Sequence, residues 1–111
     1  MIMRWAKYHN SKIVVPDGKF DSRRELSRWT ELKLMEKAGE ISFLKRQVPY
    51  TLIPSQKTEE GTLRPVKYIA DFVYEKDGQT VVEDAKGMKT KDYVIKNKMM
   101  YFFHGILIKE V

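Results

Sequence analysis

The sequence predicts a single mixed α/β domain whose central mixed sheet is flanked by helices, in the order helix, three strands, helix, strand. Three observations predict this fold class. The length of 111 residues suits one core of modest size. Capping signals mark two helices, and β-rich stretches with turn signals lie between and after them. We expect residues 1–20 to form an N-terminal arm or hairpin and residues 21–111 to form the core.

The composition is that of an ordinary soluble domain, with 42% hydrophobic and 32% charged residues. A net charge of +6 favours a polyanionic partner. The absence of cysteine excludes disulfides, thiol nucleophiles and thiolate metal sites, and suits a reducing cytoplasm. No stretch approaches the roughly 20 apolar residues that span a bilayer, and the N-terminus lacks the apolar run of a signal peptide. We therefore expect a cytoplasmic protein with no membrane partner.

The N-terminal arm places Trp5 and Tyr8 among the basic residues Arg4, Lys7 and Lys12. Such a segment suits contact with nucleic acid, with aromatic rings for stacking on bases and cations for phosphates. Packing of the aromatic residues on the core is the favoured interpretation, because exposed tryptophan is uncommon. The apolar run at 13–15, followed by Pro-Asp-Gly, predicts a short strand or hairpin.

The first helix begins near Ser22 and stops at Gly39. Ser22 and Glu25 have the spacing of a capping box, in which Glu25 reaches back to the N-cap amide. Glu25 also falls within the apolar arc that runs from Leu26 to Met35. Because a carboxylate on that arc needs a partner, we weigh equally a capping role alone and a second role in an acidic site.

Three strands are predicted between the two helices. The first covers residues 41–53, which are β-rich, with Pro49 suggesting a bend or an edge position. Residues 54–65 predict an exposed loop or hairpin tip. Residues 66–74 and 80–86 predict two strands that an Asp-Gly turn joins into a hairpin.

Thr90 is a candidate cap for a second helix over residues 91–103. Its side chains are apolar nearly all round, so we expect the helix to be largely buried. Lys96 projects inside an apolar sector, where it either snorkels or reaches a phosphate from within a cleft. Residues 105–111 predict the last strand.

The strand hairpin carries the candidate site. Asp71 lies on its first strand, and Asp84 and Lys86 lie two apart on its second, so they share a face at about 7 Å along the strand. Glu83 points to the opposite face, where a surface or supporting charge is expected. An ordinary ion pair between Asp84 and Lys86 is the alternative interpretation.

Two carboxylates beside a lysine suit metal-assisted phosphodiester hydrolysis. Mg²⁺ prefers oxygen ligands and keeps several waters, so Asp71 and Asp84 are candidate ligands, with the Ala85 carbonyl as a third and Mn²⁺ as a substitute ion. Glu25 would complete the metal shell directly or through water. Lys86 would orient or activate the attacking water and stabilise developing charge.

The expected polyanionic partner is double-stranded DNA, and branched DNA is one interpretation. Basic residues around the site are candidate phosphate contacts, although ordinary solvated charge explains them equally well. These candidates are Lys96, Lys45, Arg46, Lys89 and Lys91.

Three motifs, D-G-K-F-D-S-R-R-E, Y-I-A-D-F-V-Y and V-V-E-D-A-K-G-M-K-T, lie at residues 17–25, 68–74 and 81–90, and the resemblance that they carry extends over residues 17–110. Together they resemble the PD-(D/E)XK nuclease superfamily, and within it a family of small prophage-encoded phage-like endonucleases, or Holliday-junction-resolvase-like proteins. The resemblance implies a restriction-endonuclease-like core, with Asp71 as the metal-binding aspartate, Asp84-Ala85-Lys86 as the (D/E)-X-K triplet and Glu25 as the first-helix glutamate.

The sequence departs from the superfamily pattern at two places. Ala70 stands where the superfamily's name has proline, and the Gln-x-x-x-Tyr motif of some exonuclease branches is missing, with Asn97 and Tyr101 at that spacing. We expect a magnesium-dependent DNA endonuclease, and a homodimer if the substrate is a junction that needs two cuts. A non-catalytic nucleic-acid-binding module and a small phage interaction protein with the same fold are the alternatives.

Overall fold

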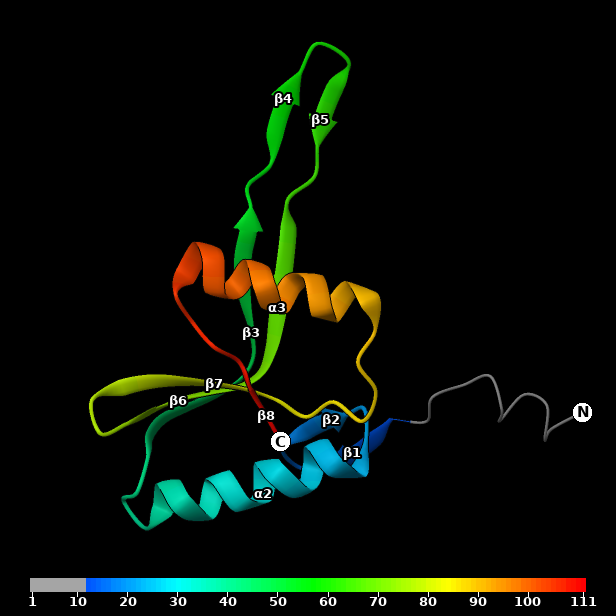
Figure 1. Ribbon diagram of the computed structural model, residues 1–111. Coiled ribbons are helices and arrows are strands. Elements are labelled where there is room, and N and C mark those ends of the chain that lie inside the picture. Colours follow the sequence, from blue (N-terminus) through cyan, green and yellow to red (C-terminus); the bar gives the residue numbers. More distant parts are fainter. Residues whose placement is uncertain (1–11) are drawn as a thin grey trace, which may run out of the picture.

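The computed structural model describes residues 12–111 (Figure 1). The predicted roles of Trp5 and Tyr8 lie outside the described residues. The first described elements are β1 (Ile13–Val15) and β2 (Gly18–Phe20), which pair as an antiparallel hairpin and confirm the hairpin predicted for this segment. Within the described part of the chain, no helix is long and apolar enough to cross a membrane.

The predicted first helix is confirmed as α2 (Arg23–Lys37). The Ser22 hydroxyl accepts a hydrogen bond from the Glu25 backbone N–H at 3.1 Å, and Gly39 ends the helix with φ of +79°. The second half of the capping box is shifted by one residue. The Glu25 carboxylate accepts from the backbone N–H of Asp21, at 3.4 Å, instead of from that of Ser22.

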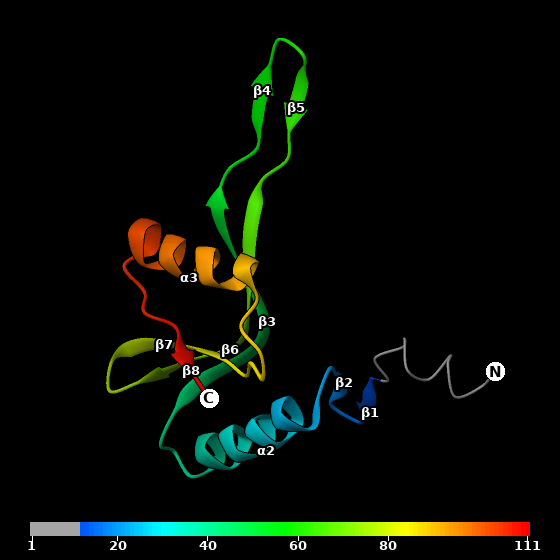
Figure 2. The same cartoon turned by 45° about the vertical axis from the view of Figure 1, so that its right-hand side comes forward.

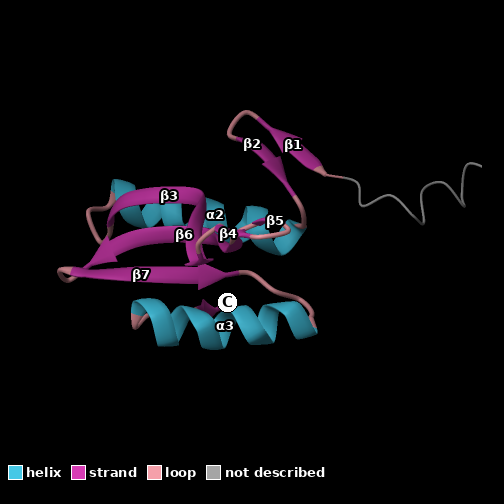
Figure 3. Cartoon of the chain, turned by 90° about the horizontal axis from the view of Figure 1, so that it is seen from above, coloured by secondary structure: helices cyan, strands magenta, loops and turns pink. Residues whose placement is uncertain are grey.

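The central sheet is mixed and has the order β3-β6-β7-β8, formed by β3 (Ser42–Ile53), β6 (Val66–Lys76), β7 (Gln79–Asp84) and β8 (Lys109–Glu110). Its first three strands are antiparallel neighbours, and β8 runs parallel to β7. One face packs against α2 and the other against α3 (Lys91–His104) (Figure 3). The predicted order of helix, three strands, helix, strand is therefore confirmed.

A second hairpin interrupts this order and projects beyond the sheet (Figures 1 and 2). It consists of β4 (Gln56–Thr58) and β5 (Gly61–Leu63), whose residues are all exposed. This arm continues the direction of β3 and β6, and it confirms the predicted exposed hairpin tip.

Strand β6 turns over at Asp71. Tyr68 and Ala70 pack in the core cluster beneath α3, whereas Phe72 and Tyr74 pack in the cluster beneath α2. In a flat strand these four residues would share one face. The bend of β6 is visible where it leaves the arm and joins β7 (Figure 2). Asp71 therefore lies at the point where the buried side chains of β6 change from the α3 face of the sheet to the α2 face.

The predicted Asp-Gly turn is confirmed, with φ of +52° at Asp77 and +78° at Gly78. Strand β7 is shorter than predicted, because it ends at Asp84 and leaves Ala85 and Lys86 beyond it. The physical reason is local: the Ala85 N–H donates to the Asp71 carboxylate at 2.8 Å instead of joining the ladder.

Helix α3 is capped as predicted, since the Thr90 hydroxyl accepts from the Tyr93 N–H at 3.1 Å. The expectation that this helix is largely buried is wrong. Only Tyr93 and Met100 are buried, and Phe102 is 81% exposed. The helix rests on the sheet through one narrow stripe, and no described element covers its outer side. The predicted last strand shrinks to Lys109–Glu110.

Candidate functional site

Asp84 is the buried end of the candidate site, with 1% of its surface exposed. Its Oδ2 accepts a hydrogen bond of 2.6 Å from the Tyr68 hydroxyl. Its Oδ1 is also buried, yet no donor in residues 12–111 bonds to it. The Lys86 Nζ lies 4.0 Å from that oxygen. A buried carboxylate oxygen without a hydrogen-bond donor is costly, so a donor or a cation beside this oxygen would lower the cost of burying Asp84.

Asp71 is half-buried at the bend of β6 and is tied to the chain after β7. Its Oδ2 accepts from the Ala85 N–H at 2.8 Å. This contact holds the Ala85 backbone beside Asp71 through its N–H, and the role of the Ala85 carbonyl as a metal ligand stays a prediction. The turn that follows is fixed from α2, because the Arg24 guanidinium donates to the backbone oxygens of Lys86 at 3.3 Å and Val111 at 3.4 Å.

Glu25 completes the acidic group from α2. It is 4% exposed, and its Oε1 lies 3.4 Å from Nη2 of Arg46. Burial raises the pKa of Glu25, and the charge of Asp71 raises it further. Burial also raises the pKa of Asp84; the Tyr68 hydrogen bond opposes this effect and the charge of Asp71 adds to it. Asp71 therefore lies close to both other carboxylates and links the two faces of the sheet.

Within residues 12–111, no cluster of three or more histidine, aspartate or glutamate side chains is arranged to hold a metal ion by itself. Mg²⁺ needs fewer, because it binds through one or two carboxylates and keeps several waters. Asp71 and Asp84 fit this requirement, since Asp84 has an oxygen without a donor and its neighbour is a second carboxylate. The residues present are therefore compatible with Mg²⁺.

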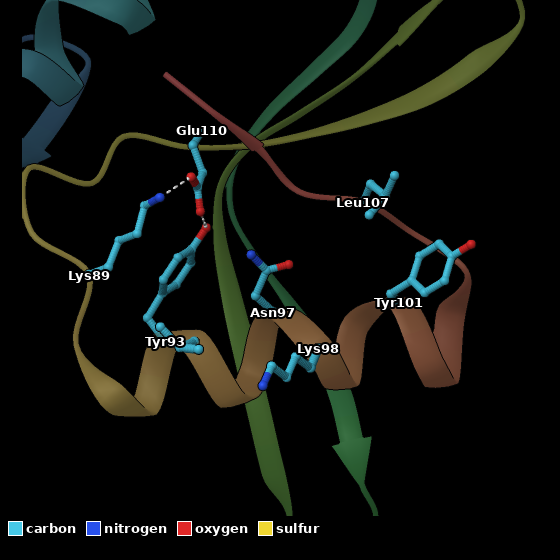
Figure 4. Close-up of a pocket in the computed structure, with 8 residues that line it drawn as sticks. Lys89, Tyr93, Asn97, Lys98, Tyr101, Leu107 and Glu110 are labelled. Carbon is cyan, nitrogen blue, oxygen red and sulfur yellow. Dashed lines mark hydrogen bonds and ion pairs between the residues drawn. The ribbon is translucent and has the colours of Figure 1, made fainter.

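Lys86 reaches the site from just beyond β7. Its side chain is 39% exposed, and its Nζ lies 5.4 Å from the centre of the Tyr93 ring. That ring is fixed in turn, because the Tyr93 hydroxyl donates to Glu110 at 2.8 Å (Figure 4). The lysine thus has a defined direction while it remains open to solvent.

The four lysines predicted as phosphate contacts divide into three groups. Lys45 and Lys91 are exposed, as a phosphate contact requires. Lys89 pairs with Glu110 at 2.7 Å, at the edge of a hollow of about 470 Å³ between α3 and β8 (Figure 4). Lys96 is half-buried beside the site.

Arg46 was predicted to face solvent, and this prediction is wrong. Its guanidinium lies 3.7 Å from the centre of the Phe20 ring, donates to the Lys19 carbonyl at 2.7 Å, and pairs with Glu25. The sequence predicted either a phosphate contact or an ordinary solvated charge, because the partners of Arg46 come from distant segments and could not be foreseen. Arg46 instead supports Glu25 and the β1–β2 hairpin.

Glu83 lies on the face opposite Asp84, as predicted, but it is fully buried and not a surface charge. It accepts two hydrogen bonds from Arg28, at 2.8 and 2.7 Å, and one from the Tyr74 hydroxyl. The sequence prediction missed Tyr68, Arg28 and Tyr74 altogether. Two of them are tyrosines on the central strand, and a buried tyrosine hydroxyl needs a polar partner, which is the signal that could have found them.

Replacing Asp84 with asparagine is expected to stabilise the fold at neutral pH. Because the folded pKa of Asp84 is raised, the folded state loses stability as pH rises from the ordinary carboxyl pKa through the raised value. Asparagine removes that cost, still accepts from Tyr68 and can donate to Asp71. We expect the melting temperature at pH 7.5 to rise by roughly 4 °C, or about 1 kcal/mol, and the gain to disappear near pH 4. A lower melting temperature at pH 7.5 would contradict the proposed cost.

The fold and site define a mixed α/β domain with an acidic group and a lysine where two central strands meet. Residues 5–107 match a family described as a protein of unknown function, DUF1064, and the chain belongs to that family. No curated protein and no solved structure matches the chain significantly.

Proposed function

We propose that this protein is a metal-dependent DNA endonuclease that hydrolyses phosphodiester bonds in the cytoplasm. One observation carries the proposal. The buried Oδ1 of Asp84 has no hydrogen-bond donor, lies beside the Asp71 carboxylate, and is 4.0 Å from Lys86 Nζ. An ordinary surface ion pair would not be buried in this way or be placed next to a second carboxylate.

The residues divide the chemistry among them. Asp71 and Asp84 would hold Mg²⁺, or Mn²⁺ in its place, with Glu25 contributing directly or through water. When bound, the ion supplies charge stabilisation on the phosphate oxygens and lowers the pKa of a bound water. Tyr68 fixes the orientation of Asp84, and because burial keeps the pKa of Tyr68 far above its usual value, the hydroxyl stays a donor. Lys86 orients the attacking water and stabilises developing charge.

Two further features support this function. The order helix, three strands, helix, strand is the layout of the PD-(D/E)XK nucleases. The residues that resemble their motif lie on α2 (Glu25), on β6 (Asp71), at the end of β7 (Asp84) and just beyond that strand (Lys86). The chain carries a net charge of +6, and this excess of basic residues suits a polyanionic substrate. Ala70 in place of proline leaves the strand intact.

The direct test is cleavage of linear duplex, single-stranded, flap and four-way-junction DNA, with Mg²⁺, with Mn²⁺ and with a chelator. We expect wild-type protein to cut at least one of these only when a metal is present. Lys86→Ala should lower the rate about a hundredfold or more, and Lys57→Ala, an exposed lysine on the arm, is the matched control. Equal cutting by wild type and Lys86→Ala would overturn the proposed site. Binding without cutting in either metal would favour a non-catalytic module.

For a branched substrate we propose that two copies act together, because two symmetric cuts need two sites. The exposed side chains of α3, among them Phe102 at 81% and Tyr101 at 57% exposure, offer an apolar surface for such pairing. Light scattering of the complex with four-way-junction DNA tests this. Only one copy of the 13.1 kDa chain per junction would contradict it.

A further inference from the structure

A basic hollow of about 240 Å³ lies between the start of α3 and the outer part of β6, next to the candidate active site. Three lysines from three different segments line it: Lys67 from β6, Lys86 from the turn after β7, and Lys96 from α3. The sequence prediction included the last two for separate reasons and did not include Lys67. The other polar residues of the lining are Tyr68, Thr90, Asp92 and Tyr93.

The charge of this hollow is only partly compensated, because its three lysines have two carboxylates nearby, Asp92 in the lining and Asp84 beside Lys86. Within residues 12–111, neither Lys67 nor Lys96 lies within 4.0 Å of a carboxylate oxygen, and Lys86 reaches Asp84 only at that limit. Asp92 is the one carboxylate of the lining. The N-terminus of the 14-residue helix α3 also borders the hollow at its cap, Thr90, and adds a partial positive charge.

The half-burial of Lys96 supports the same conclusion. It lies beside the apolar side chains of Ile95 and Met99 and is only partly exposed, and the carboxylate of Asp92, one turn earlier on α3, lies farther than 4.0 Å from it. Holding a cation there without a close counter-ion carries a cost. An anion that enters the hollow would remove that cost, so the lysine is placed to receive one.

We propose that the basic hollow binds one internal phosphodiester of a DNA strand, adjacent to the phosphate that is cut. Two residues join the hollow to the candidate active site, because Tyr68 lines the hollow and donates to Asp84, and Lys86 lines the hollow beside the same carboxylate. A strand whose phosphate occupies the hollow would bring its neighbouring phosphate to Asp71 and Asp84. The choice of DNA as the source of the phosphate rests on the proposed function.

Binding measured without cleavage tests this proposal. Fluorescence anisotropy with a duplex that has 5′-hydroxyl ends, in a chelator and across a series of salt concentrations, gives the affinity and its salt slope. The variant Lys67→Ala/Lys96→Ala removes two lysines of the hollow. Its matched control, Lys37→Ala/Lys57→Ala, removes two exposed lysines elsewhere.

We expect the hollow variant to bind about tenfold more weakly and its salt slope to fall by about one unit, because both lysines serve a single phosphate. The control should change affinity less than twofold. A fall of two units, equal effects in both variants, or binding that appears only with 5′-phosphorylated ends would each overturn the proposal. Weakened binding by the hollow variant together with no cleavage by wild type would support the hollow and reject the nuclease.

Discussion

Asp71→Asn is expected to lower DNA cleavage by about a thousandfold while the protein remains folded. Asp71 is one of the two proposed metal ligands, and its charge acts on both Glu25 and Asp84. The substitution therefore removes the negative charge of one ligand. Asparagine is nearly the same size, and its side-chain oxygen can still accept from the Ala85 N–H, which Asp71 now accepts at 2.8 Å. The loss should therefore come from the missing charge and not from a displaced strand.

Two measurements separate charge from structure. Mg²⁺ should raise the melting temperature of the wild type but not of Asp71→Asn, because an ion that binds only the folded state stabilises it. The pKa values of Glu25 and Asp84 should both fall in the variant, since the charge of Asp71 helps to raise them. Asp77→Asn is the matched control, because asparagine tolerates the positive φ of that turn. Cleavage by Asp71→Asn within tenfold of wild type would contradict its role as a ligand.

The parts of this molecule that local chemistry dictates could be predicted from the sequence. Ser22 and Thr90 cap their helices through hydrogen bonds to residues three positions away, and the Asp-Gly turn has the backbone angles that this pair favours. The acidic group was also predictable in part, because Asp71 and Asp84 lie on strands that one short turn joins.

What could not be predicted depends on distant contacts. The partners of Arg46 come from the N-terminal hairpin and from α2, and the partner of Glu83 lies 55 residues earlier in the chain. The change of face of β6 at Asp71 likewise depends on packing in both core clusters, and the sequence of the strand alone does not indicate it. The exposure of Phe102 on α3 could not be predicted either. The apolar sequence of a helix does not show how many of its faces pack against other elements.

The buried ion pair between Arg28 and Glu83 is expected to have the largest effect on stability. Burial raises the pKa of Glu83, but hydrogen bonds from Arg28 and Tyr74 outweigh burial, so the net pKa is lowered. Arg28→Ala leaves a fully buried carboxylate with only Lys109, at 3.9 Å, as a nearby cation, which should cost about 3–5 kcal/mol in chemical denaturation at pH 7. Lys33→Ala is the matched control: it breaks a 2.8 Å pair with Asp17 whose lysine side chain is 48% exposed, and it should cost far less than Arg28→Ala because exposed ion pairs contribute little.

The pH dependence gives this prediction a second readout. In the wild type, the lowered pKa of Glu83 means that its stabilisation is present above the ordinary carboxyl pKa and is lost as pH falls through the lowered value. In Arg28→Ala, burial still raises the pKa of Glu83, but the charge of Arg28 no longer lowers it. The variant should therefore lose less stability than the wild type when the pH is lowered. A cost below about 1 kcal/mol would mean that water reaches Glu83. Because Glu83 precedes Asp84 on β7, the pair that holds α2 to the sheet also fixes the strand that carries the candidate site.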